Sequence, residues 1–309
     1  MQQKKINTIK NFINLNEIDR DELYNILTFG LAAKNDKTGY SNLLKNKSLI
    51  LLFDEPSTRT RISFELAINQ LGGHCIFLDS STSQLGRGES IKDTAKVLSR
   101  YVDGVIIRNA SHKDLNEFAN NSDCSVINAL TNLSHPCQIM ADLMTLHEHM
   151  GSIENINIAW VGDGNNVANT WIQASQIFGF NLNMAVPSQF SPNKNYLKLA
   201  LDNKAKINIT ENINDVVSNA DCIVTDTWVS MNDKETNKEE KIKILEQYQV
   251  NEKLFEKTPK HAVFLHCLPA HRGQEVTNEV IDSPRSLVYQ QAENRLHIQK
   301  GILKYCFGI

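Results

Sequence analysis

The sequence lacks the features that mark several specialised classes of protein. No apolar run is long enough to span a membrane, and no apolar segment follows Met1–Lys5, so we expect neither a membrane protein nor a secretory leader. A formal net charge of −3 leaves no basic excess, which argues against a general nucleic-acid binder. The six cysteines form no C-x-x-C pair and no framework spacing, which indicates reduced thiols and a cytoplasmic protein.

The composition is that of an ordinary globular protein. Hydrophobic residues make up 41% and charged residues 22% of the 309 residues, and we find no internal repeat or low-complexity segment. A chain of this length exceeds a typical single hydrophobic core, so two domains are expected.

Apolar runs typical of buried strands alternate with helical patterns along the chain, with no hairpin signal between them. They lie at 48–52, 74–78, 104–107 and 125–129 in the first half, and at 156–161, 182–186, 222–225 and 262–265 in the second. This alternation is typical of parallel sheets with crossover helices. The sequence therefore predicts an α/β protein of two domains, each with a parallel sheet flanked by helices, and the second domain is expected to be Rossmann-like.

The chemistry of the first half begins where the first predicted strand runs into a helix. The first turn of that helix consists of Ser57, Thr58, Arg59 and Thr60. Its backbone N–H groups and the positive end of the helix dipole attract an anion, and Arg59 adds a guanidinium suited to phosphate oxygens. Arg61 lies on another face of the helix and is expected to pair with a structural carboxylate. An ordinary capped helix with surface arginines is the competing interpretation.

Two more strand ends in this half carry polar side chains. Arg108 follows one strand, and His135 and Gln138 begin the helix after the next, where a spacing of three places them on one face. Ligands of parallel sheets bind at the carboxyl ends of strands, so these groups suit a small phosphorylated compound that carries a carbonyl and an amide. Gln84 lies in the polar loop 80–89 and would reach a ligand if that loop folds over one.

The second half offers polar groups suited to an amino acid. Asn166, Asp226 and Ser230 match the carboxylate and ammonium of such a substrate. Cys267 follows the last predicted strand, and we favour a substrate contact over a covalent nucleophile because no orienting His–Asp pair is evident. The charged segment 232–243 is predicted to be a mobile loop.

Two cofactor hypotheses find little support in the sequence. The run Gly162–Gly164 resembles the start of a dinucleotide-binding fingerprint, but Val167 replaces its third glycine and the next strand ends without an acidic residue. His266, Cys267 and His271 suggest a metal, but no second cluster at ligand spacing supports one. We therefore expect no cofactor and no metal.

Taken together, these motifs resemble those of the ornithine carbamoyltransferases, and the resemblance covers the whole chain. The stretch Ser57–Arg61 and the motif His135-Pro136-Cys137-Gln138 are shared by carbamoyltransferases in general. The motifs Asp226-x-Trp-x-Ser230-Met231 and His266-Cys267-Leu268-Pro269 resemble the ornithine branch, whereas an aspartate-specific relative would show residues like His-Pro-Gly-Pro at the second of these. Asn232 stands where the family often has glycine, which leaves the shape of the closing loop open.

The resemblance implies a reaction and an organisation. The reaction is transfer of the carbamoyl group of carbamoyl phosphate to the δ-amino group of L-ornithine, which gives L-citrulline and phosphate. The implied organisation is a carbamoyl-phosphate-binding domain at 1–145 completed by a C-terminal helix at 286–309, and an ornithine-binding domain at 146–285. The expected partners are the two small-molecule substrates and further copies of the chain in a trimer, with no nucleic acid and no membrane.

The same resemblance assigns roles to individual residues. The catalytic group would be Arg108, His135, Asp226 and Cys267. Carbamoyl phosphate would be held by Ser57, Thr58, Arg59, Thr60, Gln84, Arg108, His135, Gln138, Cys267, Leu268 and Arg295. Ornithine would be held by Asn166, Asp226, Ser230 and Met231.

Three other functions stay open at this point. Within the same class, the carbamoyl acceptor would be another amine, such as putrescine or acetylornithine. From other classes, the candidates are an NAD-dependent dehydrogenase, disfavoured by the incomplete glycine pattern, and a catalytically silent module that senses an anion.

Overall fold

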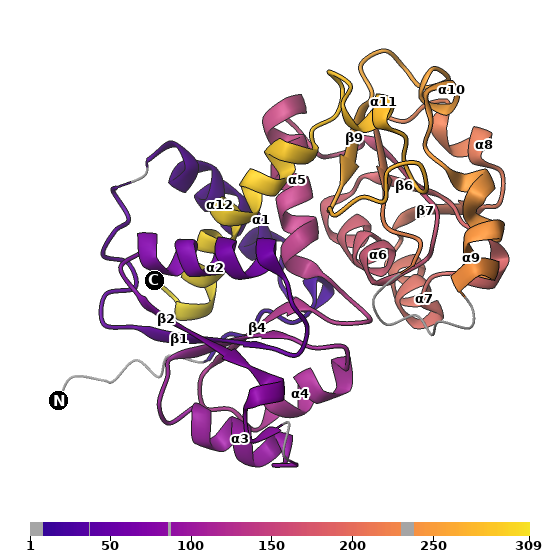
Figure 1. Ribbon diagram of the computed structural model, residues 1–309. Helices are drawn as coiled ribbons and strands as arrows, with labels where there is room; N and C mark the ends of the chain where they lie inside the picture. The colour runs from indigo at the N-terminus through magenta and orange to yellow at the C-terminus, as the bar shows by residue number, and fades with distance from the viewer. Residues whose placement is uncertain (1–8, 37, 86–87, 230–237) are drawn as a thin grey trace. The chain divides into compact units, whose positions relative to one another are not determined.

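The structure is a computed structural model that describes residues 9–36, 38–85, 88–229 and 238–309 of the chain (Figure 1). The chain forms two compact units. The first unit comprises residues 1–131 and 295–309, and the second comprises residues 132–294. Each unit contains one parallel sheet with helices around it.

The sheet of the first unit has the strand order β2-β1-β3-β4. Its strands are β1 (Ser48–Phe53), β2 (His74–Asp79), β3 (Gly104–Arg108) and β4 (Ser125–Leu130). On one face lies α2 (Thr58–Gln70), and on the other lie α3 (Ile91–Leu98) and α4 (His112–Asn120) (Figure 1). The unit also contains α1 (Arg20–Asn35) and the C-terminal part of α12 (Val288–Phe307).

The apolar patterns of the sequence explain how these layers pack. Ile50 and Leu52 of β1 are buried in one cluster with Leu115 and Phe118 of α4, because alternate residues of a strand face the same side of the sheet. The opposite helix α2 buries the residues that the 3.6-residue period selects, among them Phe64, Ala67 and Ile68. The predicted strand–helix connection is thereby confirmed.

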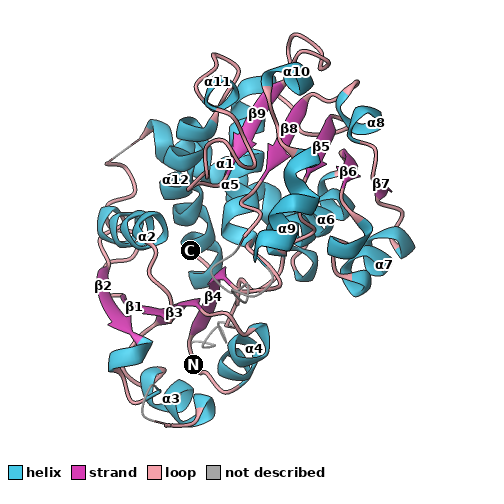
Figure 2. Cartoon of the chain, turned by 45° about the vertical axis from the view of Figure 1, so that its right-hand side comes forward, coloured by secondary structure: helices cyan, strands magenta, loops and turns pink. Residues whose placement is uncertain are grey.

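The sheet of the second unit has the strand order β7-β6-β5-β8-β9 (Figure 2). Its strands are β5 (Asn157–Val161), β6 (Asn181–Ala185), β7 (Lys206–Thr210), β8 (Cys222–Thr225) and β9 (Val263–His266). The helices of this unit are α5 (Pro136–Met150), α6 (Asn166–Phe178), α7 (Lys194–Asp202), α8 (Ile213–Val217), α9 (Lys238–Leu245), α10 (Glu252–Phe255) and α11 (Asn278–Ile281), and α12 begins here. The order is Rossmann-like, with a topological switch between β5 and β8. The predicted fold class is confirmed.

Two segments differ from the sequence-based expectation. The expected loop 232–243 becomes α9 from Lys238 onward, because acidic residues in its first turn and Lys243 in its last complement the helix dipole and Leu245 is buried. Strand β7 was not predicted. It is an edge strand whose side chains are mostly exposed, so its sequence contains no apolar run. Among the described residues, no helix has both the length and the apolar character needed to cross a lipid bilayer.

Candidate functional site

The helix turn that the sequence predicts to bind an anion is the first turn of α2. Ser57 is the N-cap residue, and its hydroxyl accepts a hydrogen bond from the Thr60 N–H at 3.4 Å. Thr58 and Arg59 are exposed, whereas Thr60 is buried. The other N–H groups of this turn, the helix dipole and the nearby guanidinium of Arg59 are suited to a phosphate group.

Arg61 takes the structural role predicted for it. Its Nε lies 2.8 Å from Oε1 of Glu65, one turn along the helix. Its guanidinium also lies 3.7 Å from the ring centroid of Phe77 on β2. Both arginines are exposed, but these contacts direct the Arg61 guanidinium toward Glu65 and β2.

Two more predicted arginines lie in the first unit. Arg295, on α12, is buried, and its Nη2 donates to Oγ1 of Thr60 at 3.2 Å. Arg108 ends β3 and lies 3.9 Å from a carboxylate oxygen of Glu55, in the connection between β1 and α2. The structure therefore brings Arg295 directly to the predicted anion turn, and places Arg108 beside the connection that precedes it.

Gln84 is exposed in the segment after β2. Its backbone carbonyl accepts a hydrogen bond from the Glu89 N–H at 3.1 Å. The described contacts do not join its side chain to the anion turn, so its predicted role is untested.

His135 and Gln138 are both buried at the start of α5 in the second unit. The His135 backbone N–H donates to Oγ1 of Thr170 on α6 at 2.8 Å, and the Thr170 hydroxyl donates to the carbonyl of Asn166 at 2.7 Å. The side-chain nitrogen of Gln138 donates to Oδ1 of Asp142 at 2.7 Å. His135 is thus bonded to the neighbouring helix α6, whereas Gln138 is bonded to Asp142 one turn along its own helix.

Asp226 joins the ends of three elements at the topological switch of the second sheet. It follows β8 and is buried. Its Oδ1 accepts a hydrogen bond from the thiol of Cys267, which follows β9, at 2.9 Å. Its Oδ2 accepts a hydrogen bond from the side-chain amide of Asn165, the N-cap of α6, at 2.8 Å. The crevice at such a switch point is where open α/β sheets bind ligands, and Asn166 is the first residue of the same helix.

Sequence analysis missed Asn165 as a member of this group. Its side-chain oxygen accepts from the backbone N–H groups of Val167 and Ala168 while its nitrogen reaches Asp226. The only signal available in the sequence was its position before the helical pattern, which indicates a cap and not a contact to a distant strand.

The backbone after β9 has an unusual conformation. Leu268 has a φ of 59°, in the left-handed region, and precedes a cis peptide bond to Pro269. Its N–H donates to Nδ1 of His266 at 2.9 Å. Nε2 of His266 lies 3.2 Å from Oε1 of Glu275, and both side chains are completely buried. Left-handed backbone costs free energy in a residue with a Cβ, so surrounding contacts must maintain it.

A metal site is a possible use of this cluster. Ligand atoms of Asp226, His266 and Cys267 lie within 4.8 Å of one another. Both imidazole nitrogens of His266 already have partners in Leu268 and Glu275, and the thiol of Cys267 is hydrogen-bonded to Asp226. A metal ion would have to displace these contacts, so the geometry favours a hydrogen-bonded network.

The dinucleotide hypothesis meets a steric obstacle at Gly164. A Cβ there would lie 2.4 Å from both the Phe190 carbonyl oxygen and the Pro192 nitrogen, so a neighbouring chain segment packs directly on the glycine turn. The Gly164 N–H donates to that Phe190 carbonyl at 2.9 Å. The backbone surface that would approach a pyrophosphate is therefore covered by protein.

Two predicted residues, Ser230 and Met231, lie outside the described residues.

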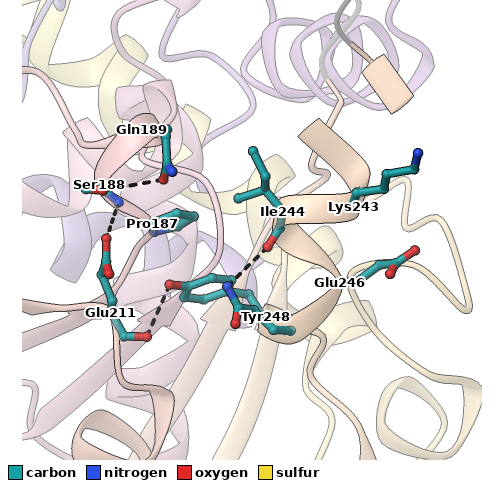
Figure 3. Close-up of a pocket in the computed structure, with 9 residues that line it drawn as sticks. Pro187, Ser188, Gln189, Glu211, Lys243, Ile244, Glu246 and Tyr248 are labelled. Carbon is teal, nitrogen blue, oxygen red and sulfur yellow. Dashed lines mark hydrogen bonds between the residues drawn. The ribbon is translucent and has the colours of Figure 1, made fainter. Parts of the chain in front are cut away.

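A cavity of about 480 Å³ in the second unit is lined by residues after β6 and β7 and by α9 (Figure 3). There the Glu211 carboxylate accepts the Ser188 N–H at 2.8 Å, and the Tyr248 hydroxyl donates to the Glu211 carbonyl at 3.1 Å. None of the predicted site residues lines this cavity.

Comparison with known proteins identifies the family. The family model described as "Aspartate/ornithine carbamoyltransferase, carbamoyl-P binding domain" matches residues 10–148, and the model described as "Asp/Orn binding domain" of the same family matches residues 154–306. A protein named ornithine carbamoyltransferase from Rhodopseudomonas palustris is 49% identical over 305 residues, with 98% of each chain covered. One of that name from Archaeoglobus fulgidus is 44% identical over 302 residues, covering 97% of this chain and 98% of the relative.

Solved structures agree with this comparison. The ornithine carbamoyltransferase from Pyrococcus furiosus superposes with a TM-score of 0.91 at 40% identity, with 97% of each chain covered. The anabolic ornithine carbamoyltransferase from Campylobacter jejuni also gives a TM-score of 0.91, at 37% identity, covering 96% of this chain and 99% of the other. Because both family models match and near full-length relatives exceed 40% identity, the chain belongs to the aspartate/ornithine carbamoyltransferase family.

Proposed function

We propose that the protein transfers the carbamoyl group of carbamoyl phosphate to the δ-amino group of L-ornithine, which gives L-citrulline and phosphate. The observation that carries the proposal is the partly buried Asp226–Cys267 hydrogen bond at the switch point of a sheet that matches the Asp/Orn binding domain. These two residues belong to the motifs that resemble the ornithine branch of the family.

The carbamoyl-phosphate roles are proposed for residues of both units. The anion turn, Arg59 and Arg108 would bind the phosphate, and Arg295 and His135 would polarise the carbonyl. Gln138 and the backbone at Cys267 and Leu268 would hold the amide nitrogen. The hydrogen bond from Arg295 to Thr60 supports this assignment, because it brings a cation from the C-terminal helix to the phosphate-binding turn.

The ornithine roles are proposed for the switch point of the second sheet. Asn166, Asp226, Ser230 and the Met231 backbone would bind the α-carboxylate and α-ammonium groups. Asp226 and Cys267 would lie near the δ-amino group. The carboxylate of Asp226 is a suitable acceptor for an ammonium, and its contacts with Asn165 and Cys267 hold it in place.

The proposed chemistry is direct transfer. The neutral δ-amine attacks the carbamoyl carbon, negative charge develops on the carbonyl oxygen, and phosphate leaves with the electron pair of the broken C–O bond. Donors from Thr60, Arg108 and His135 would stabilise the developing oxyanion. No covalent enzyme intermediate is required because carbamoyl phosphate is already activated.

Deprotonation of the nucleophile is the main energetic obstacle. An amine with a pKa of about 10.4 costs roughly 3 kcal/mol to present in its neutral form at a pH near 8. Nearby arginines and partial exclusion of water lower such a pKa. The departing phosphate would accept the proton that the amine still carries after attack.

One parallel assay tests the proposal. Carbamoyl phosphate is incubated with ornithine, aspartate, putrescine or acetylornithine, and phosphate release is followed alongside the carbamoylated product. We expect turnover with ornithine, whereas preferred turnover with another amine would replace ornithine as the acceptor. Absence of turnover with all four would favour an anion-sensing module.

We further propose a cytoplasmic homo-oligomer of the trimeric type. All six cysteines are free, which suits a reducing compartment. Ile62 and Leu66, one turn apart on α2, are 50% and 43% exposed, an apolar surface that a second copy would cover. Static light scattering of the purified chain would test the trimer.

We favour a biosynthetic direction for the reaction, as in the anabolic relative from Campylobacter jejuni.

The domain limits also stay a proposal. The prediction placed 1–145 with the C-terminal helix in the carbamoyl-phosphate domain and 146–285 in the ornithine domain. The compact units divide before α5, at 131, whereas the family models divide after it, between 148 and 154. Helix α5 is bonded to the part of α12 that precedes Arg295, and its N-cap residue His135 is bonded to α6, so these contacts of α5 lie within the second unit.

A further inference from the structure

A buried chain of hydrogen bonds runs from Gln138 to the end of β9 through Asp142. Oδ1 of Asp142 accepts from the side-chain nitrogen of Gln138 at 2.7 Å and from that of Gln291, on α12, at 2.6 Å. The side-chain oxygen of Gln291 then accepts the backbone N–H of His266 at 3.1 Å. Each of these four side chains is at most 1% exposed.

The chemistry of the carboxylate determines how both amides are oriented. An ionised carboxylate only accepts hydrogen bonds, so each glutamine must present its NH₂ end to Asp142. The oxygen of Gln138 is then the end of the amide that points away from Asp142, and the oxygen of Gln291 is the end that meets the His266 N–H.

A purely structural role does not account for this arrangement. A buried carboxylate loses its hydration, and replacement of buried charged groups by apolar residues of similar volume is often neutral or stabilising. The α5–α12 contact already has a polar connection one turn away, where the Asn294 amide donates to the Thr145 hydroxyl at 2.9 Å and to Glu148. Asp142 is distinguished from that connection by what it orients.

We propose that Asp142 is a positioning residue that makes the site specific for a carbamoyl group. The proposal rests on the function proposed above, in which Gln138 and the backbone at Cys267 and Leu268 bind the amide nitrogen of the substrate. Asp142 directs the carbonyl oxygen of Gln138, an acceptor, toward that NH₂ group. Through Gln291 it also fixes the strand end that leads into Cys267 and Leu268. An acyl phosphate with a methyl group in place of the NH₂ has no hydrogen to donate to these acceptors.

Acetyl phosphate is the probe that separates this role from general support of the fold. It shares the phosphate and carbonyl groups of carbamoyl phosphate and lacks only the amide. The experiment measures KM for carbamoyl phosphate with ornithine saturating, and the inhibition constant of acetyl phosphate as a competitor. We expect Asp142→Leu to raise KM for carbamoyl phosphate by about tenfold or more and to leave the acetyl phosphate constant unchanged.

Two further variants provide the controls. Asp142→Asn retains an oxygen that can accept both amide N–H groups, so it should restore most of the affinity for carbamoyl phosphate. Thr145→Val removes one of the two hydrogen bonds of the neighbouring connection between α5 and α12 and lowers stability to thermal unfolding, yet it should change neither constant. An Asp142→Leu variant that leaves KM unchanged, or that weakens both ligands equally, would overturn the proposal.

Gln291→Met tests the same chain if Asp142→Leu does not fold. It removes the bonds to Asp142 and to the His266 N–H while filling a similar volume. A higher KM for carbamoyl phosphate with an unchanged acetyl phosphate constant supports the proposal, and an unchanged KM overturns it. Failure of the proposed function itself is distinguishable, because the unmodified protein would then release no phosphate with carbamoyl phosphate and ornithine.

Discussion

Arg295 and Thr60 are 235 positions apart in the chain, and the guanidinium of one donates to the hydroxyl of the other at 3.2 Å. Both side chains are buried, and Thr60 belongs to the first turn of α2. This contact brings the C-terminal helix to the turn of the first unit that is proposed to bind phosphate. It explains why an arginine far from the anion-binding motif belongs to the same group of residues.

Removal of the Thr60 hydroxyl should therefore affect stability and activity together. Thr60→Val preserves the shape of the side chain but deprives Arg295 of an acceptor, so we expect unfolding free energy to fall by roughly 1–3 kcal/mol. Citrulline formation should fall as well. Thr60→Ser keeps the hydroxyl and serves as the control. Urea unfolding and steady-state kinetics measure both effects, and equal behaviour of the two variants would contradict this account.

Arg59→Ala and Arg108→Ala should abolish turnover and leave the fold intact. Arg59 is exposed and Arg108 is the last residue of β3, so neither belongs to the hydrophobic core. Arg272→Ala is a matched control, because Arg272 forms a surface pair with Asp282 at 2.6 Å. Circular dichroism checks the fold and product assays check activity. Near-normal citrulline output from either of the first two variants would disprove the assignment.

Acid should destabilise the first unit through His112. Burial lowers the pKa of this imidazole below its ordinary value of 6.5. Its Nδ1 lies 2.8 Å from Oγ1 of Thr131, and its Nε2 lies 3.3 Å from the amide nitrogen of Asn14, a donor, which suits the neutral ring. Its contribution to stability is thus fully present above 6.5 and is lost as the pH falls below that value, where the unfolded chain binds the proton first.

Urea unfolding of the wild type and His112→Gln, from a pH of about 7.5 to about 5.5, measures this contribution. The wild type should lose more unfolding free energy over this range than the variant does. The comparison cancels the titration of other groups, because the two proteins differ at one site. Parallel pH profiles would show that His112 is not the source of the loss.

Gly164→Ala should destabilise the second unit. Its Cβ would lie 2.4 Å from two backbone atoms, and backbone cannot rotate away as a side chain can. We expect a loss of roughly 1–3 kcal/mol in unfolding free energy, typical of overpacking. Gly104→Ala is a milder comparison, since its nearest neighbour is the Phe307 ring at 3.3 Å. An unchanged unfolding free energy in Gly164→Ala would contradict this expectation and mean that the segment 190–192 moves away from the added Cβ at little cost.

The sequence by itself determined the fold class and most of the chemistry of the proposed site. Alternation of strands and helices depends on local periodicity, which is why the strand before Ser57 and the helix after it were predictable. Motifs such as Ser57–Arg61 and His135–Gln138 are also local. Helix geometry also predicted different roles for Arg59 and Arg61. The Arg61–Glu65 ion pair confirms the structural role predicted for Arg61.

Only the tertiary structure decided how distant side chains support these motifs. The contacts of Asp226 with Asn165 and Cys267, and of Asp142 with Gln291, join residues from 41 to 149 positions apart. No periodicity encodes such pairs, because a side chain's partner depends on which strand ends and helices the fold brings together. Local patterns determine the helices and strands. The partner of a buried polar group is determined by the fold, because such a group must form a hydrogen bond with whichever residue the fold places beside it.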